Sequence, residues 1–81
     1  MRVTIECYGV SARWCGSDAI TLALADGATG SQALDALAAL YPDFAARRDS
    51  VAIASGDAIA SPTAPLFDGD VIALIPPVSA G

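Results

Sequence analysis

The stretch ADGATGSQALDALAALYPDF, residues 25–44, decides the fold because it carries the long helical pattern of the chain. Asp26-Gly27 favours a turn. Thr29, with Gln32 three residues later, fits a capping box, in which each of the two side chains accepts a backbone N–H of the other residue. Apolar residues then recur at helical spacing, at Leu34, Leu37, Ala38 and Tyr41, with Ala33, Leu40 and Phe44 widening the stripe. Pro42 ends the helix near Tyr41, because the residue before a proline is pushed out of the helical region. We therefore expect one amphipathic helix of about three turns, with Leu34 and Leu37 facing the rest of the fold.

Two strands are expected before this helix. Residues 2–8 alternate, with Val3, Ile5 and Cys7 on one face, and residues 19–24 alternate in the same way. Such alternation is typical of half-buried strands. Residues 9–18, bracketed by Gly9 and Gly16, break the pattern and are expected to form a loop. The two strands and this loop predict a hairpin.

Short strands are expected after the helix. Residues 51–54 form one candidate, and residues 58–60 can pair back on it. Residues 61–70 contain two prolines and Asp68-Gly69, which favour a loop that closes in a tight turn. The last strand, VIALIP at 71–76, is almost continuously apolar, which suits a central strand buried on both faces.

The resulting order, β-β-α-β-β-β, predicts an α+β fold. The economical arrangement places the final strand beside the first and packs the helix across the sheet, with a right-handed crossover between the parallel neighbours. This is the β-grasp, or ubiquitin-like, architecture, with a mixed sheet of roughly four to five strands and one main helix. We expect a β-grasp domain over residues 1–75 and an extended C-terminal tail over residues 76–81.

Composition narrows the possible functions. The chain has 81 residues and a net charge of −5, and its four cations are all arginine. The chain lacks the cluster of basic residues that nucleic-acid binding requires, whereas its acidic surface favours a basic partner protein. Two cysteines, no histidine and no CxxC motif leave almost no ligands for a zinc site. No leader pattern and no apolar run of membrane-spanning length are present, so we expect a cytoplasmic protein with no membrane partner.

The side chains offer little for catalysis. There is no histidine or lysine to serve as a base, and most single carboxylates fall in turns, so the chain is not expected to be catalytic alone. Cys7 is expected to be a small buried hydrophobe and Cys15 a loop residue, with a redox or sulfur-handling role left open for Cys15. Trp14 and Phe67 stand in predicted loops, where each can fold onto the core or anchor a partner surface.

The terminal segment is the remaining candidate for chemistry. Pro76 and Pro77 have no backbone N–H to donate to a neighbouring strand, and they favour an extended polyproline conformation. They are therefore expected to project the chain away from the sheet. Val78 offers one foothold, and Ser79, Ala80 and Gly81 taper to almost no side chain. A narrow tail of this kind can be threaded into a partner's tunnel, where its carboxylate can be activated and react.

The final sixteen residues, LFDGDVIALIPPVSAG, carry a resemblance to a known family. An Asp-Gly-Asp turn, a last strand, two prolines and a short tail are similar to the C-terminal signature of the MoaD/ThiS sulfur-carrier family. Pro-Pro-Val-Ser is closer to the small subunit of molybdopterin synthase than to the thiamine-pathway carrier. The segments YGVSARWCG and ALYPDF are also similar in placement, so the likeness spans nearly the whole chain.

The resemblance implies a carrier that acts through its partners. Gly81 would be adenylated by a ubiquitin-activating-like enzyme that uses ATP, and would then carry a thiocarboxylate, with no cofactor bound to the chain itself. Pro76, Pro77, Val78, Ser79 and Ala80 would form the arm that enters the large subunit of molybdopterin synthase, where the sulfur builds the dithiolene of molybdopterin.

The chain departs from the family at one position, because the family ends in Gly-Gly and Ala80 stands here at the penultimate place. Its methyl group restricts the backbone and adds bulk in a tight tunnel. Three alternatives therefore stay open: a ubiquitin-like modifier conjugated through Gly81, a sulfur carrier for thiamine or another sulfur-containing metabolite, and a β-grasp interaction domain without terminal chemistry.

Overall fold

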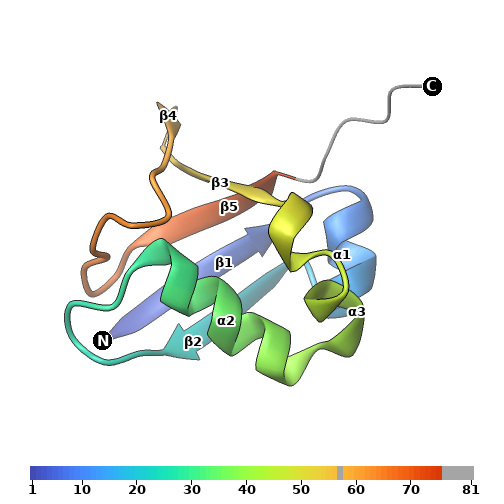
Figure 1. Ribbon diagram of the computed structural model, residues 1–81, viewed down its shortest axis with the longest axis horizontal. Helices are drawn as coiled ribbons and strands as arrows, with labels where there is room; N and C mark the ends of the chain where they lie inside the picture. The colour runs from blue at the N-terminus through green and yellow to red at the C-terminus, as the bar shows by residue number, and fades with distance from the viewer. Residues whose placement is uncertain (57, 76–81) are drawn as a thin grey trace.

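The computed structural model describes residues 1–56 and 58–75 as one mixed sheet with helices packed against it (Figure 1). In chain order the elements are β1 (Arg2–Cys7), α1 (Val10–Cys15), β2 (Ala19–Ala23), α2 (Gly30–Leu40), α3 (Pro42–Ala45), the 3-10 helix η1 (Arg48–Ser50), β3 (Ala52–Ser55), β4 (Ala58–Ile59) and β5 (Val71–Ile75). The strands lie in the order β2-β1-β5-β3-β4. This order confirms the predicted α+β β-grasp architecture.

The last strand lies in the middle of the sheet. β5 runs parallel to β1, with Ile5 opposite Ile72, and antiparallel to β3, with Ile53 opposite Leu74. β1 and β2 form the predicted antiparallel hairpin, and β4 pairs back on β3. The chain therefore reaches β5 after crossing from one half of the sheet to the other through α2, as the parallel pairing requires.

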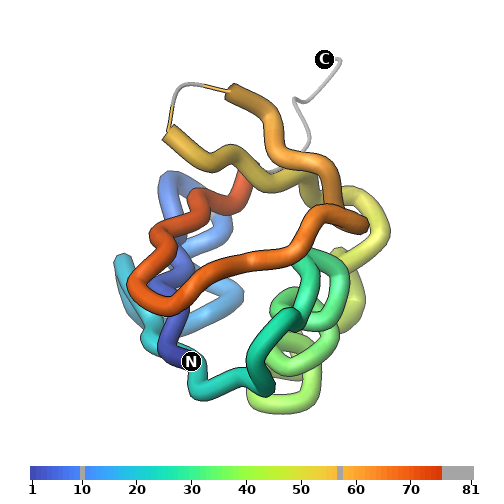
Figure 2. Tube along the Cα trace, turned by 90° about the vertical axis from the view of Figure 1, so that its left-hand side faces the viewer, coloured from blue at the N-terminus to red at the C-terminus, as the bar shows by residue number. Residues whose placement is uncertain are grey.

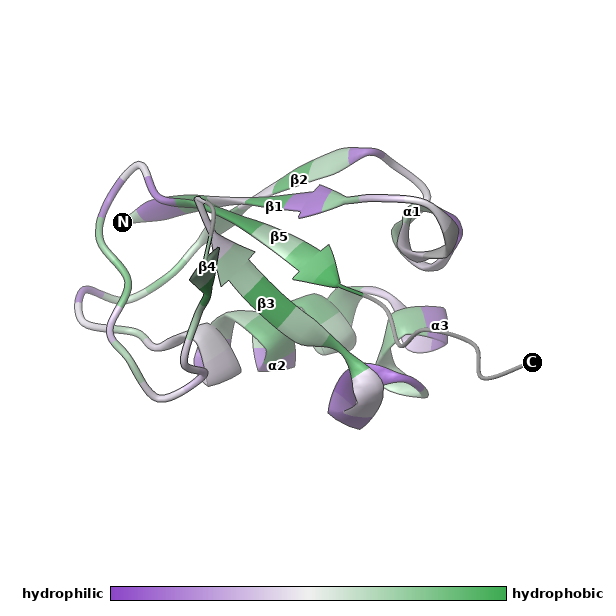
Figure 3. Cartoon of the chain, turned by 90° about the horizontal axis from the view of Figure 1, so that it is seen from above, coloured by the Kyte–Doolittle hydropathy of each residue, from purple (hydrophilic) through white to green (hydrophobic). Residues whose placement is uncertain are grey.

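The core lies between the sheet and the helices. Viewed from above, α2 and α3 lie on the same side of the strands (Figure 3). Leu34 and Leu37 of α2 are 3% and 0% exposed, which confirms that they face the sheet. The sheet contributes alternate residues of its strands, so that the side chains meeting the helices include Val3, Ile5, Leu22, Ile53, Ile72 and Leu74.

The capping box sets the start of α2 as predicted. The backbone N–H of Gln32 donates to Thr29 Oγ1 at 3.3 Å, and the Thr29 N–H donates to Gln32 Oε1 at 2.8 Å. The segment after β4 passes close to this helix start (Figure 2), where the Ser31 N–H donates to the Pro62 carbonyl at 2.8 Å. These bonds satisfy N–H groups that have no partner inside the helix. Tyr41 caps the other end, and Pro42 begins α3.

The segment predicted as a loop at residues 9–18 contains a helix, so that expectation was wrong. α1 spans Val10–Cys15, between Gly9 with a φ of 56° and Gly16 with a φ of 69°. Both glycines hold left-handed backbone that other residues rarely adopt, and Gly16 closes the helix in the way glycine commonly does. The bracketing glycines are therefore the boundaries of a short helix, and Cys15 is buried within it instead of lying in a loop.

Two burial expectations also need correction. β5 occupies a central position but is not buried on both faces, because Ile72 and Leu74 are buried while Val71 is 46% exposed. The helices cover one face of the sheet, and in the described residues no element covers the other. Leu40 does not join the core stripe either, since the helix ends at this residue and its side chain is 60% exposed.

Candidate functional site

The carboxyl end of β5 is the point from which the predicted tail departs. Ile75 is the last described residue of the chain and pairs with Ala52 of β3, while Leu74 pairs with Cys7 of β1. Strands on both sides therefore hold the end of β5 in place. The predicted tail residues, Pro76, Pro77, Val78, Ser79, Ala80 and Gly81, lie outside the described residues.

An apolar face of the sheet leads to this point. Residues of β5, β3 and β4 that point away from the helices form what we call the open sheet face: Val71, Ala73, Ile75, Ala52, Ala54 and Ile59. The register makes it continuous, because Ala54 pairs with both Ile59 and Ala73. Ile59 is 70% exposed. Contiguous exposed apolar surface of this kind marks interaction sites.

Polar groups border the open sheet face on its β1 side. Glu6 is paired with Ala73 in the sheet, and Tyr8 follows two residues later, beyond the end of β1. The Glu6 carboxylate, by hydrogen bonding and charge, raises the pKa of the Tyr8 hydroxyl above its ordinary value. The face therefore has an apolar centre and an acidic, hydrogen-bonding rim, the usual arrangement of a protein interface.

The two aromatic candidates lie in different places. Phe67 is 69% exposed, and its N–H donates to Asp70 Oδ2 at 2.8 Å in the turn before β5. Trp14 lies on α1, half-buried, with the Arg47 guanidinium 5.2 Å from its ring centroid. The ring thus holds α1 against the segment after α3 through a cation–π contact. Of these two candidates, Phe67 is the one with an exposed ring, and it precedes the start of β5, at the opposite end of the strand from Ile75.

The two cysteines are both buried and both free. The prediction that Cys7 is buried is confirmed, and the prediction that Cys15 is a loop residue is wrong, since Cys15 ends α1 and, like Cys7, is 2% exposed. Burial raises the pKa of both thiols, that of Cys7 to about 12. Neither thiol is therefore a ready nucleophile in the closed fold.

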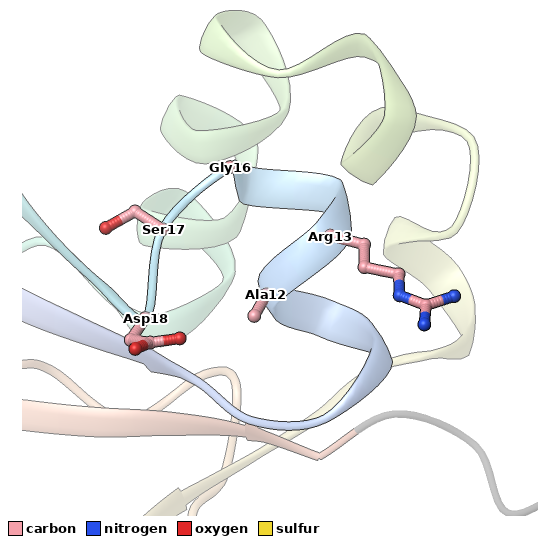
Figure 4. A pocket seen from close by; sticks show the side chains of 5 residues that line it. All are labelled: Ala12, Arg13, Gly16, Ser17 and Asp18. Carbon is pink, nitrogen blue, oxygen red and sulfur yellow. The ribbon is translucent and has the colours of Figure 1, made fainter.

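A shallow depression opens beside α1 and its following turn (Figure 4). Its lining is Ala12, Arg13, Gly16, Ser17 and Asp18. The Arg13 and Asp18 side chains point in different directions, and the Ser17 hydroxyl donates to the Ala19 carbonyl at 2.9 Å. Over residues 1–56 and 58–75, no three potential metal-ligating side chains gather, and no helix is long and apolar enough to cross a membrane.

Sequence reasoning missed the open sheet face, although part of its signal was present. Val71, Ala73 and Ile75 alternate with the buried Ile72 and Leu74, which in a strand places them on the opposite side. Ile59 gave no signal by itself, because its two-residue strand joins the face only through its pairing with β3.

Comparisons with known proteins agree with this geometry. The chain is similar to SAMP1 from Haloferax volcanii, at 26% identity and a TM-score of 0.87, over 100% of both chains. It is also similar to subunit 1 in the complex of subunits 1 and 2 of the molybdopterin-converting factor from Helicobacter pylori 26695, at 27% identity and a TM-score of 0.67, again over 100% of both chains. A molybdopterin converting factor subunit 1 from Pyrococcus furiosus shares the fold, at 23% identity and a TM-score of 0.86, over 96% of this chain and 99% of that one.

No curated protein matched the chain. The sequence profile of the ThiS family, in contrast, matches residues 14–81, which include α2, every strand after it and the whole predicted tail. Sheet order, the central last strand and this match together lead to one conclusion: the chain belongs to the ThiS family of β-grasp, ubiquitin-like proteins.

Proposed function

We propose that the chain is a sulfur carrier of the molybdopterin synthase type, in which Gly81 bears the sulfur as a thiocarboxylate. The observation that carries the proposal is the open sheet face, which runs to Ile75 at the end of β5, directly before Pro76. A partner bound on this face is placed to receive the residues that follow. Membership of the ThiS family and the likeness to subunit 1 of the H. pylori complex support the same function.

In this proposal the chain supplies the reacting carboxylate and its partners supply the catalysis. The Gly81 carboxylate attacks the α-phosphate of ATP in a ubiquitin-activating-like adenylating enzyme, which releases pyrophosphate and leaves an acyl adenylate. A sulfur nucleophile then displaces AMP to give the thiocarboxylate. The chain has no histidine or lysine with which to catalyse these steps itself, and ATP binds to the enzyme.

The large subunit of molybdopterin synthase is the partner proposed for the open sheet face. Ile59 is its most exposed large apolar residue, so Ile59→Ala should weaken the complex by about tenfold, the loss typical of truncating an interface anchor. Leu40→Ala is the matched control, since Leu40 is similarly exposed, at 60%, but lies on α2 behind the sheet. Equal effects of the two substitutions on calorimetric affinity would contradict this docking face.

Intact mass tests the chemistry. The chain is incubated with ATP, the adenylating enzyme and a sulfur source, and exchange of one carboxylate oxygen for sulfur is expected at Gly81. A chain extended by one residue beyond Gly81 is the control, because it presents the carboxylate at the wrong place. Sulfur gain by the extended chain, or none by the natural chain, would contradict the proposal.

A second function is favoured by the likeness to SAMP1, a small archaeal modifier protein. In it, the activated Gly81 carboxyl group is transferred to lysines of other proteins instead of receiving sulfur. The same mass experiment, with candidate acceptor proteins added, separates the two. Higher-mass conjugates that resist thiols indicate the modifier, and a thiocarboxylate without conjugates indicates the carrier.

A further inference from the structure

Two free cysteines lie together under the end of the sheet where β5 finishes. Cys7 is the last residue of β1 and pairs with Leu74, and Cys15 is the last residue of α1. Both belong to the same buried cluster, with 2% of each residue exposed. The two thiols lie close enough for each to influence the pKa of the other. The proposed function uses neither of them.

The backbone holds these two residues near each other. The Cys7 N–H donates to the Asp18 carbonyl at 2.8 Å, which ties the end of β1 to the turn after α1. At the other end of the helix, the Ser11 hydroxyl donates to the Tyr8 carbonyl at 2.6 Å. α1 is therefore folded back over the end of β1 by bonds on both sides, and the meeting of the thiols follows from the path of the chain.

We propose that Cys7 and Cys15 are a modification site, at which a disulfide oxidant such as oxidised glutathione creates a reversible intramolecular disulfide that clamps α1 to β1. One thiolate attacks the oxidant's disulfide, forms a mixed disulfide and releases one reduced thiol. The second cysteine then loses its proton and attacks the sulfur of the first, which releases the other reduced thiol. The two cysteines give up two protons and two electrons, and the oxidant's disulfide takes them up.

The surroundings of the thiols set the order of attack. Burial raises the pKa of both thiols; the neighbouring Cys15 raises that of Cys7 further, whereas Cys7 partly offsets the increase at Cys15, so Cys15 ionises first. Cys15 is accordingly the attacking residue, and Cys7 resolves the mixed disulfide. Because both thiols are buried, an oxidant reaches them when α1 opens locally. The helix has only six residues, too few to be stable by itself, so it can open locally without unfolding of the sheet.

The test uses the whole reduced chain with excess oxidised glutathione. After acid quenching, the chain is unfolded, treated with N-ethylmaleimide and weighed intact. A monomer two hydrogens lighter, with neither maleimide nor glutathione attached, is expected, and dithiothreitol should restore two maleimide-reactive thiols. A chain that keeps both thiols, gains glutathione at both cysteines or forms disulfide-linked dimers would overturn the proposal.

Single variants test the roles. Cys7→Ser should retain one glutathione on Cys15, because nothing resolves it, and Cys15→Ser should react several-fold more slowly. Equal rates would overturn the assigned order of attack. If either variant fails to fold, the natural chain alone tests the clamp. Formation of the disulfide should raise its melting midpoint by several degrees, and reduction should return the midpoint to its original value. An unchanged or lower midpoint would refute the clamp. No adenylating enzyme or ATP is used, so the result is independent of the proposed function.

Discussion

Replacing Gly30 by alanine should destabilise the fold although α2 favours alanine over glycine. Gly30 is the first residue of the helix and is buried against β3 and the segment after β4. A Cβ placed there would overlap Ile53 Cδ1 and lie 3.4 Å from the Pro62 Cα. Ile53 is itself only 2% exposed, so its side chain has little room to move. Overpacking of this kind costs about 1–3 kcal/mol, which exceeds the gain in helix propensity of up to about 1 kcal/mol.

A second substitution isolates the steric cause. Ile53→Val removes the overlapping methyl group and should cost about 0.5–1.5 kcal/mol alone. In the double variant Gly30→Ala/Ile53→Val, the alanine methyl group fills the space that the isoleucine methyl group has left. The loss of unfolding free energy, measured by urea denaturation, should therefore be about 1 kcal/mol smaller than the sum of the losses of the two single variants. Ile53→Val combined with Ala39→Gly, on the exposed side of α2, should be additive. If the effects of Gly30→Ala and Ile53→Val also add, a clash between the new Cβ and the Ile53 side chain is refuted.

Three further predictions follow from the core, the thiols and the tail. Leu37→Ala should lower the free energy of unfolding by about 2–4 kcal/mol, because it leaves a cavity under the sheet, and an unchanged urea midpoint would contradict the helix packing. Cys7 has an ordinary pKa of 9.0 when unfolded and about 12 when folded, so its contribution to stability is full below pH 9 and is lost as pH rises to 12. Cys7→Ala should reduce the loss of unfolding free energy between pH 9 and pH 12, measured by urea denaturation at each pH. The same loss in the natural chain and the variant would contradict a raised Cys7 pKa. Ala80→Gly should preserve or raise ATP–pyrophosphate exchange with the adenylating enzyme, since it restores glycine's backbone freedom, and exchange absent from both chains would exclude activation by that enzyme.

The features predicted well are those set by neighbouring residues. The capping box at Thr29 and Gln32 depends on three residues of spacing and on nothing distant, and it forms as expected. Pro42 stops α2 for an equally local reason. The alternation of Val3, Ile5 and Cys7 correctly placed them on the buried face, because side chains of a strand alternate whatever its neighbours are.

The features predicted poorly depend on what packs from elsewhere. α1 was missed because six residues are too few to establish helical periodicity, although Gly16 at its end is a known helix-stop signal. The uncovered face of β5 could not be foreseen from an almost continuously apolar strand, which has the same composition whether one face or two are covered. The open sheet face can be predicted only when the pairing of β3, β4 and β5 is known, because its residues come from all three strands.

The parallel pairing of β1 and β5 has a mechanical consequence. Tension applied beyond Ile75 pulls β5 along its own axis, between β1 on one side and β3 on the other. Such a load stretches the hydrogen bonds of both ladders at the same time, in shear, whereas a strand peeled sideways would lose them one after another. A partner that grips the end of this chain and pulls on it therefore meets the resistance of both ladders of β5 at once.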